Sequence, residues 1–371
     1  MRIKSIEIIR ESFPTSFRDN IGNYYAGTPF EKISGIAFNI SKDIPKANFY
    51  SVIINTDSEH SGVCVRVDEH TAKNIKDYHQ MFTGLDCLCS FNNWQSLRKN
   101  FRHVNEAIRA IGTIDCALWD IKGKFFNTSV GRLLGSPESI EIDCYCSLIN
   151  LDIDASSADT IAEGIKNLHF WGQKWSLPDG PNEGREGLFR NITRAKKLRE
   201  AVGIRHRLMF DVKGNWNVDY FNEFVKQSRD INITWIEEPL PNDTVNGYKK
   251  INRDYSLFAA GEHCTSLEGF HFLTALKGLA AIQPDIVWCG GITPSIMIFN
   301  LAFLEHKMIS PHGRALIPSL HIASAYSHKS IVLEYNLLLE TERQYKNKKP
   351  LIPQNGKLVY ISDNYKGLWN K

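Results

Sequence analysis

The 371-residue sequence has no long apolar run and no block of five or six charges of one sign. No run approaches the ~18 apolar residues that a membrane helix needs, so a membrane-spanning protein is not expected. Lys and Arg number 44 against 41 Asp and Glu, which leaves a net charge of +3 and no surface suited to phosphates. We therefore expect neither a nucleic acid nor a membrane as a partner.

The eight cysteines include no C-x-x-C pair, which speaks against a redox motif or a zinc site. Several lie in apolar segments such as IDCALWDI, where a thiol behaves as a small hydrophobic group. Near the N-terminus, charges at Arg2, Lys4, Glu7 and Arg10 interrupt any apolar core of a signal peptide. We expect reduced cysteines and a cytoplasmic protein.

The composition is that of a globular protein, with 43% hydrophobic and 23% charged residues. Residues 1–136 predict a small α+β domain, in which FYSVIINT and VCVRV form a hairpin. A helix is predicted from about residue 104 to 124, because apolar residues step by 3, 4 and 3 along it. These residues are Ile111, Ile114, Leu118 and Ile121.

Residues 137–343 alternate short β-rich runs with stretches that have room for one helix. The eight runs are CYCSLI, QKWSL, RLMFDV, TWIEEPL, LFAAGEH, AAIQPDI, MISPHG and VLEY. This order predicts parallel strands joined by right-handed crossovers and closed into a barrel. No glycine-rich phosphate loop follows the first run, which argues against a dinucleotide-binding sheet. In residues 344–371, the Asn-Gly of PLIPQNGKLVYI predicts a terminal hairpin that folds back on the smaller domain.

A polar residue ends each of the last six predicted barrel strands. These residues are Asp211, Glu237, Glu262, Asp285, His312 and Glu334. Their spacing is close to one strand-plus-helix unit each time. Because the C-terminal ends of barrel strands face one shared mouth, the six side chains are expected to converge there.

Asp211, Glu237 and Glu262 follow three consecutive strands. A single acid after a strand is often just the N-cap of the next helix. Three carboxylates in one partly buried mouth repel one another unless a cation lies between them. Oxygen ligands with open positions suit Mg²⁺, so the sequence predicts a magnesium site.

Asp285 and His312 lie on neighbouring strands and form the next candidate pair. A carboxylate beside an imidazole fixes its tautomer and raises its basicity, as a general base requires. The alternative is a histidine that only caps a strand in a Pro-His-Gly turn. His263 directly follows Glu262 and is a candidate donor to a substrate or a leaving hydroxyl, provided that the backbone bends there.

Two lysines are candidate site residues. Lys174 lies on the second barrel strand, where a nearby Mg²⁺ would push it toward its neutral form, as a base or as a donor to a carboxylate. A solvated loop lysine is the alternative. Lys213 lies two residues beyond Asp211 and is expected to share its strand face.

The strings GTIDCALWDIKGK, GRLLGS, LMFDV, WIEEPLP, AAGEH, IQPDIVWCGGIT, SPHG and LEY together resemble the enolase superfamily in its mandelate racemase branch. The resemblance covers nearly the whole chain, in order. It implies an α/β fold, a modified (β/α)7β barrel of the TIM type, under an α+β capping domain built from the N-terminal region and the C-terminal tail. It also implies Mg²⁺ on Asp211, Glu237 and Glu262, a dyad of Asp285 and His312, and a Glu334 that hydrogen-bonds the substrate carboxylate.

One departure narrows the resemblance. Racemases of this branch carry Lys-x-Lys on the second barrel strand, whereas this chain has Lys174-Trp175-Ser176, and a serine does not replace the second base. The runs QKWSLPDGP and Gly-Glu-His resemble acid-sugar dehydratases of the L-rhamnonate dehydratase type. That resemblance implies removal of the α-proton by His312 and loss of the 3-hydroxyl, helped by His312 or His263, to give a 2-keto-3-deoxy acid. Lys174 or Glu334 would support the carboxylate end.

Candidate substrate-binding residues lie in the loop RDNIGNYYAGTP and in the barrel. They are Arg18, Tyr24, Tyr25, Ser176 and Arg314. Two other functions stay open: an epimerase or cycloisomerase working through the same ene-diolate, with Lys213 as its second acid, and a non-catalytic sugar-acid binding protein. The Asp285–His312 pair argues against the latter, because a binding protein needs no tuned base. Members of the family form symmetric assemblies, so a homo-oligomer is expected.

Overall fold

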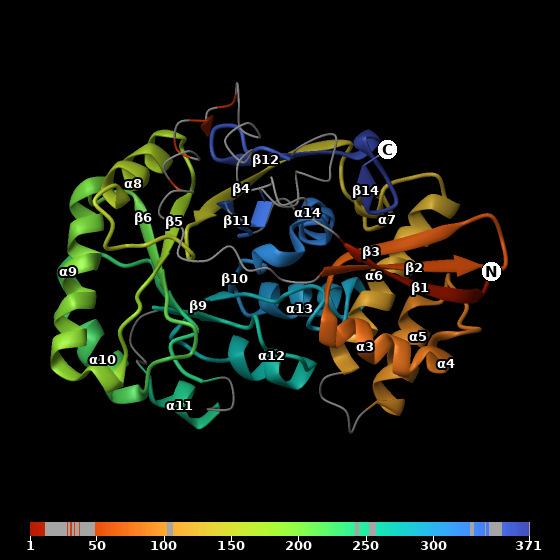
Figure 1. The fold of residues 1–371 in the computed structure, drawn as a ribbon, viewed down its shortest axis with the longest axis horizontal. Coiled ribbons are helices and arrows are strands. Elements are labelled where there is room, and N and C mark those ends of the chain that lie inside the picture. Colours follow the sequence, from red (N-terminus) through yellow and green to blue (C-terminus); the bar gives the residue numbers. More distant parts are fainter. Residues whose placement is uncertain are drawn as a thin grey trace.

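The computed structural model describes residues 1–11, 28, 30, 31, 33, 37, 49–101, 107–241, 245–251, 257–326, 330–337, 339–340 and 351–370. Figure 1 shows them as a barrel with its surrounding helices on the left and in the centre, and a smaller cap on the right. None of the helices in these residues has the length and apolar character needed to cross a membrane. All eight cysteines are free thiols, and only Cys89 is exposed.

The cap is a three-stranded antiparallel sheet covered by helices. Its strands follow the order β1 (Ile3–Glu11), β2 (Phe49–Thr56) and β3 (Ser61–Asp68), and β2 and β3 form the predicted hairpin. Its helices are α3 (Glu69–Asp77), α4 (His79–Phe82), α5 (Ser90–Asn100), α6 (Ala107–Phe125) and α7 (Val130–Leu133). Alternate residues of β2 and β3, such as Val52, Ile54 and Cys64, are buried on the side where α6 packs.

Helix α6 is the helix that the apolar spacing predicts. Ile111, Ile114, Leu118 and Ile121 are all buried, and so are most residues on its other faces. The reason is that α6 lies between the cap sheet and the barrel, so it has little surface left for solvent. It therefore fixes the cap relative to the barrel.

Eight parallel strands form the barrel. They are β4 (Ser139–Ser147), β5 (Gly172–Ser176), β6 (Arg207–Asp211), β7 (Trp235–Glu237), β8 (Phe258–Ala260), β9 (Leu279–Ile282), β10 (Met308–Ile309) and β11 (Leu333–Asn336). Each pairs in parallel with the next, β11 returns to β4, and a parallel bridge between Ile309 and Ile331 closes the ring. All eight predicted strands are present.

A helix follows each of the first seven barrel strands. These helices are α8 (Ala158–Asn167), α9 (Gly184–Val202), α10 (Val218–Gln227), α11 (Val245–Lys250), α12 (Leu267–Thr274), α13 (Ile292–Leu304) and α14 (Leu316–Ala325). Short 3₁₀ turns lie at Pro181–Glu183, Arg229–Ile231, Gly313–Ala315 and Ser362–Asn364. The predicted modified (β/α)7β barrel with an α+β cap is confirmed.

The barrel interior has an apolar floor and a polar mouth. The floor is formed by Tyr145, Met209, Trp235, Ala259, Ala281 and Val332. Because side chains alternate along a strand, the residue two positions beyond a floor residue points into the same interior. Asp211 thus lies above Met209, Glu237 above Trp235 and Glu334 above Val332, at the C-terminal ends of their strands.

The C-terminal segment departs from its prediction. Asn355 and Gly356 form the expected turn, with φ values of 49° and 71°. However, the strand after it, β12 (Lys357–Ile361), pairs antiparallel with the first half of β4 in the barrel rather than forming a hairpin on the cap. This pairing is possible because β4 is longer than its neighbours and leaves an edge unpaired. The domain limits 1–136, 137–343 and 344–371 stay predictions.

The last described residues return to the cap. The short pair β13 (Tyr365–Lys366) and β14 (Trp369–Asn370) lies beside it in Figure 1. The backbone N–H of Leu368 donates to Asp120 of α6 at 2.9 Å, and the indole N–H of Trp369 donates to the Val63 carbonyl at 2.9 Å. The C-terminal segment thus binds both the barrel and the cap.

A buried hydrogen-bond cluster joins the cap to the barrel. Asp115 of α6 accepts the backbone N–H of Thr293 at 2.9 Å and its hydroxyl at 2.6 Å, at the start of α13. Burial raises the pKa of Asp115 to about 7. Gly112 allows the close approach, since a Cβ at this position would lie 1.9 Å from the Val287 carbonyl oxygen. The cap is thereby held against the β9–α13 loop at the barrel mouth.

Candidate active site

Lys174 occupies the centre of the carboxylate cluster in the mouth. Its side chain is fully buried on β5, and its Nζ lies 2.5 Å from Glu237 Oε1, 3.0 Å from Glu334 Oε1 and 4.0 Å from Asp211 Oδ2. Gln283, just after β9, donates its amide N–H to the other oxygen of Glu237. The structure therefore brings together side chains from β5, β6, β7 and β11, as their placement at strand ends predicts.

The charges of this cluster depend on one another. Burial raises the pKa of Asp211, and raises that of Glu237 to about 8, while Lys174 opposes both shifts. For Glu334, burial is outweighed by Lys174, which lowers its pKa to about 2. Burial also works against the Lys174 ammonium, but Glu237 and Glu334 raise its pKa above the ordinary value. These carboxylates favour the charged, donating form of Lys174. Its role beside Mg²⁺, as a base or as a donor to a carboxylate, stays a prediction.

His312 lies between two carboxylates. Its Nδ1 is 2.9 Å from Asp285 Oδ2, and its Nε2 is 3.3 Å from Glu262 Oε1. Asp285 is fully buried and its other oxygen accepts the backbone N–H groups of Val287 and Trp288 at 2.9 and 3.0 Å. These bonds fix the carboxylate, which in turn fixes the imidazole with Nδ1–H toward Asp285 and Nε2 toward the mouth.

Burial disfavours the charged His312 ring, but Glu262, Asp285 and Glu334 together raise its pKa to about 10. A histidine acting as a base must be neutral, so part of this negative charge has to be offset. A divalent cation bound to neighbouring carboxylates has that effect.

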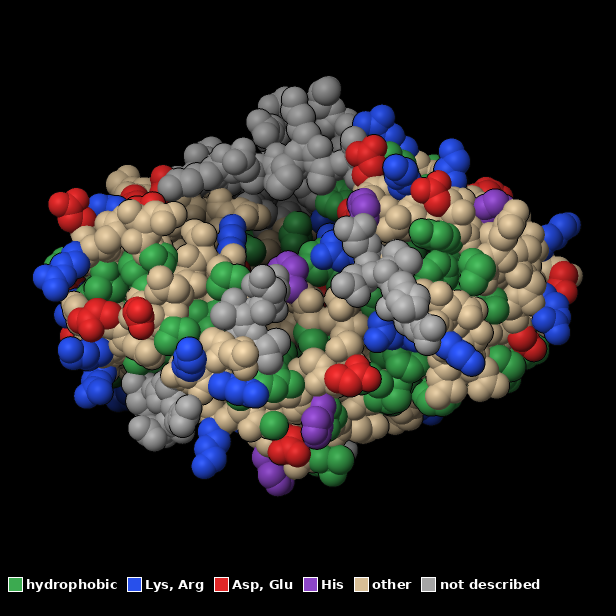
Figure 2. Space-filling model, turned by 90° about the horizontal axis from the view of Figure 1, so that it is seen from below, with side chains coloured by type: hydrophobic (Ala, Val, Ile, Leu, Met, Phe, Trp, Pro, Cys, Tyr) green, Lys and Arg blue, Asp and Glu red, His purple; other side chains and the backbone are tan. Residues whose placement is uncertain are grey.

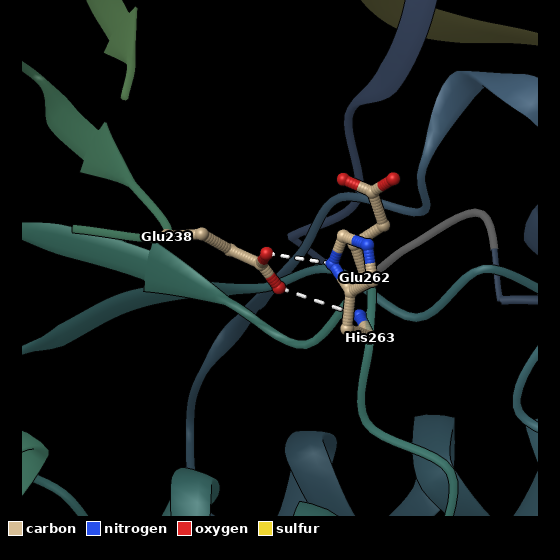
Figure 3. A group of neighbouring side chains, drawn as sticks. All are labelled: Glu238, Glu262 and His263. Carbon is tan, nitrogen blue, oxygen red and sulfur yellow. Dashed lines mark hydrogen bonds and ion pairs between the residues drawn. The ribbon is translucent and has the colours of Figure 1, made fainter. Parts of the chain in front are cut away.

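Glu238 and His263 form a second carboxylate–histidine pair. Figure 3 shows the Glu238 carboxylate turned toward His263. The Glu262 carboxylate points away from Glu238. His263 Nδ1 lies 2.7 Å from Glu238 Oε2, and the pKa of His263 is raised by this hydrogen bond. Gly261, with φ of +129°, bends the chain directly before Glu262, which is the bend that the His263 hypothesis required.

The donor set suits a hard divalent cation. Six carboxyl groups surround the mouth: Asp211, Glu237, Glu238, Glu262, Asp285 and Glu334. Among the described residues, Lys174, His263 and His312 form ion pairs with members of this group. In the described part of the chain, ligand atoms from Glu238, Glu262 and His263 lie within 4.8 Å of one another. The predicted ligands Asp211, Glu237 and Glu262 lie at the ends of consecutive strands but do not form such a compact group.

The structure places Lys213 and Ser176 differently from the sequence hypotheses. Strand β6 ends at Asp211, and Lys213 has φ of 53°, so it does not share the strand face of Asp211. Its side chain is exposed, while its backbone N–H donates to Asp211 at 2.8 Å. The Ser176 hydroxyl donates to the Ile149 carbonyl at 2.7 Å. Both residues line a hollow of about 260 Å³ beside Asp211.

Of the remaining substrate-binding candidates, the structure describes Arg314. Arg314 donates to the Arg66 carbonyl at 3.0 Å and pairs with Asp68 at 3.4 Å, so it joins the barrel to the cap. Arg18, Tyr24 and Tyr25 lie outside the described residues. Figure 2 shows a hollowed region on the lower face, where histidine, Lys or Arg and hydrophobic side chains gather.

Three site residues were missed from the sequence. Glu238 stands next to a predicted ligand in WIEEPLP, and Gln283 stands two residues before Asp285 in IQPDI, so position alone offered a signal for both. Trp288 contacts His263 and His312, with ring centres 5.4 and 5.9 Å apart. Nothing in the local pattern distinguishes this tryptophan from a core residue.

Together, the fold and the site define a capped (β/α)7β barrel with a carboxylate-lined mouth and an aspartate–histidine pair. Residues 56–135 match the family model described as the N-terminal domain of mandelate racemase / muconate lactonizing enzyme, and residues 155–364 match the enolase C-terminal domain-like model. The chain therefore belongs to the enolase superfamily, in its mandelate racemase / muconate lactonizing enzyme family.

Among relatives, an L-rhamnonate dehydratase of Saccharopolyspora erythraea is 35% identical over 232 residues, which is 62% of this chain. The match spans about half (54%) of that protein's length. The crystal structure of an L-rhamnonate dehydratase from Gibberella zeae superposes with a TM-score of 0.77 at 26% identity, over 100% of this chain and 93% of that one. A Mg-complexed structure of the Gibberella zeae enzyme gives a TM-score of 0.76 at 24% identity, over 100% and 93%.

Proposed function

We propose that the protein is a Mg²⁺-dependent acid-sugar dehydratase, a hydro-lyase that converts a sugar acid to its 2-keto-3-deoxy product. The observation that carries this proposal is the placement of His312, which is held by Asp285 and presents Nε2 beside Glu262 in the mouth. A fixed imidazole next to a cluster of oxygen ligands suits proton removal beside a carboxylate. The two L-rhamnonate dehydratases named above support the same reaction class.

Asp211, Glu237 and Glu262 would hold Mg²⁺, which when bound supplies stabilisation of the negative charge that develops as the α-proton leaves. Lys174 is fully buried and contacts both Glu237 and Glu334, so it would hold these two carboxylates in position. His312 Nε2 takes the proton from the α-carbon, while Asp285 orients the ring and stabilises its charged form.

The C–O bond at carbon 3 then breaks, and the hydroxyl leaves as water with a proton from His312 or from His263. His263 is held through Nδ1 by Glu238, which leaves Nε2 for this task. The resulting enol converts to the keto acid. A homo-oligomeric assembly and a cytoplasmic location stay predictions.

The test is a screen of purified protein with Mg²⁺ against aldonic, aldaric and uronic acids, with detection of 2-keto acid as the semicarbazone. We expect one group of acids to react and His312→Asn to lower kcat by about 10²- to 10⁴-fold, as for loss of a general base. His306→Asn is the matched control, because His306 is exposed and its φ of 53° suits asparagine. Its activity should be unchanged.

Other outcomes would contradict the proposal. Exchange of the α-proton in deuterated water without keto acid would show epimerisation or cycloisomerisation. Binding of a sugar acid with neither exchange nor product would show a non-catalytic binding protein.

A further inference from the structure

Trp288, in the loop between β9 and α13, lies against both histidines of the mouth. Its side chain is only 9% exposed, and its ring centre is 5.4 Å from that of His263 and 5.9 Å from that of His312. Within the described ranges, the indole N–H has no hydrogen-bond partner. A buried N–H donor beside the reacting groups that no protein acceptor satisfies is available to a ligand.

Arg109 packs on the face of this tryptophan. It comes from the first turns of α6 in the cap, and its guanidinium carbon is 3.8 Å from the Trp288 ring centre. No hydrogen bond or ion pair of this guanidinium is found with the residues that the structure describes. A guanidinium has five N–H donors, and stacking on an aromatic ring leaves all of them free for an anion.

Two acids near Arg109 and Arg314, Asp68 and Asp285, already have other partners. Asp68 accepts from the backbone and hydroxyl of Thr71, at 2.8 and 2.9 Å, and pairs with Arg314. Asp285 is bound to His312 and to two backbone N–H groups. Arg314 lies 4.8 Å from the same tryptophan ring, so two guanidinium groups adjoin Trp288. The local charge favours an anion.

The distances fit one end of a sugar acid. The Arg109 guanidinium carbon lies 3.8 Å and the His312 ring centre 5.9 Å from the centre of the Trp288 ring, so these two groups are less than about 10 Å apart. The end carbons of an extended six-carbon acid are about 6 Å apart, with ~1.5 Å per bond, and hydrogen bonds add about 3 Å. A substrate whose α-carbon lies at His312 can therefore place its far end at Arg109.

We propose that Arg109 and Trp288 form a subsite for a second carboxylate at the far end of the substrate, so that the protein acts on dicarboxylic (aldaric) sugar acids. Arg109 binds the carboxylate as an ion pair, and the Trp288 N–H donates to the same group or to the adjacent hydroxyl. This inference rests on the proposed dehydratase function.

The test compares aldaric and aldonic acids of the same configuration, such as glucarate with gluconate and galactarate with galactonate. We expect a wild-type preference in kcat/KM of roughly 10- to 100-fold for the reactive aldarate, as for a charged hydrogen bond. Arg109→Gln should remove this preference mainly by raising KM for the diacid, and should leave the monoacid unchanged. The matched control is Arg207→Gln, since Arg207 also stacks on a tryptophan, Trp171, at 4.4 Å, but at the opposite end of β6.

Trp288→Phe provides a second variant, which keeps the ring under Arg109 and removes only the N–H. We expect its KM for the diacid to rise about 3- to 10-fold relative to its KM for the monoacid. An equal preference of the wild type for monoacids, or equal losses for both acids in the two variants, would overturn the subsite. If no acid is dehydrated, the proposed function fails; calorimetric binding of glucarate and gluconate to the wild type and Arg109→Gln then decides the subsite by itself.

Discussion

At the residue scale, the charge balance of the mouth depends on Lys174. Within the described ranges it is the one buried lysine, and it contacts the buried carboxylates of Glu237 and Glu334 directly. Removing one partner of a buried ion pair leaves the other charge without compensation, which costs about 3–5 kcal/mol. A methionine fits the space of the lysine stem but carries no charge.

We therefore expect Lys174→Met to lower the free energy of unfolding by about 3–5 kcal/mol at neutral pH in the absence of Mg²⁺. Urea unfolding followed by circular dichroism measures this change. Lys226→Met is the control, because the Lys226 side chain is 71% exposed and pairs with Glu223 of its own helix. A loss below about 1 kcal/mol in Lys174→Met, as is usual for surface pairs, would show that the carboxylates do not need this cation.

His321 gives a second prediction at this scale, one that concerns pH. It is fully buried on α14, accepts the backbone N–H of Gly131 at Nδ1 and donates from Nε2 to the Leu368 carbonyl, with the rings of Tyr360 and Tyr365 beside it. Burial lowers its pKa from 6.5 to about 4. The unfolded chain therefore binds a proton between these values that the folded protein does not.

The resulting stability is fully present above pH 6.5 and is lost as the pH falls toward 4, by about 3 kcal/mol in total. In His321→Asn, which keeps an acceptor for Gly131, the free energy of unfolding should fall less steeply over this range. Chemical denaturation at a series of pH values measures the two profiles, with the exposed His271→Asn as control. Parallel profiles for the wild type and His321→Asn would contradict the assignment.

The position of a single site residue could be predicted where the neighbouring sequence alone determines it. Asp285 and His312 were paired from strand spacing alone, and the structure holds them 2.9 Å apart. Lys213 was misplaced because the strand ends at Asp211 and the positive φ that follows leaves no mark in the apolar pattern. Arg109 and Trp288 meet only because the cap docks on the barrel, so no spacing along the chain relates them.

At the scale of elements, α6 is the helix on which the cap depends. A glycine inside a helix is usually replaced by alanine with a gain of about 1 kcal/mol. Gly112 is different, because a Cβ there would lie 1.9 Å from a backbone oxygen of the β9–α13 loop. That loop carries Trp288 and the backbone N–H groups that bind Asp285.

We expect Gly112→Ala to destabilise the protein by about 1–3 kcal/mol, as overpacking does, and to lower activity by displacing this loop. Thermal unfolding and the dehydratase assay measure the two effects. Gly164→Ala in α8 is the control, since its Cβ would meet only the side-chain end of Ile33. Stabilisation of Gly112→Ala to the same degree as the control would mean that the helix and loop separate freely.

The elements themselves were largely predictable. Eight apolar runs, separated by segments long enough for one helix, predict the barrel. They could be recognised because the spacing of apolar residues within each short segment indicates a strand or a helix. The partner of β12 was not predictable, since its pairing with β4 depends on an edge that exists only once the barrel has formed.

At the scale of the whole molecule, the proposed magnesium site links ligand binding to folding. A cation that binds only the folded protein adds about 2.7 kcal/mol of stability at 100 times its Kd. Mg²⁺ added to protein treated with EDTA should therefore raise the Tm by several degrees in a concentration-dependent way. Differential scanning calorimetry measures the shift.

Glu262→Gln should remove most of this shift, and Glu305→Gln, at an exposed position on the barrel surface, should retain it. The highest Mg²⁺ concentration in this titration is about 10 mM. If the Tm of the wild type does not change up to that concentration, the magnesium site is refuted.

The closure of the barrel has a consequence for how the chain is made. Strand β4 pairs with β5, but its other neighbours, β11 and β12, lie roughly 190 or more positions further along the chain. At about 5–20 residues per second of synthesis, ~10–40 s pass before these partners leave the ribosome. During that interval β4 presents an open edge beside the newly formed sheet, so we expect ribosome-bound chaperones to be needed mainly for the first half of the barrel.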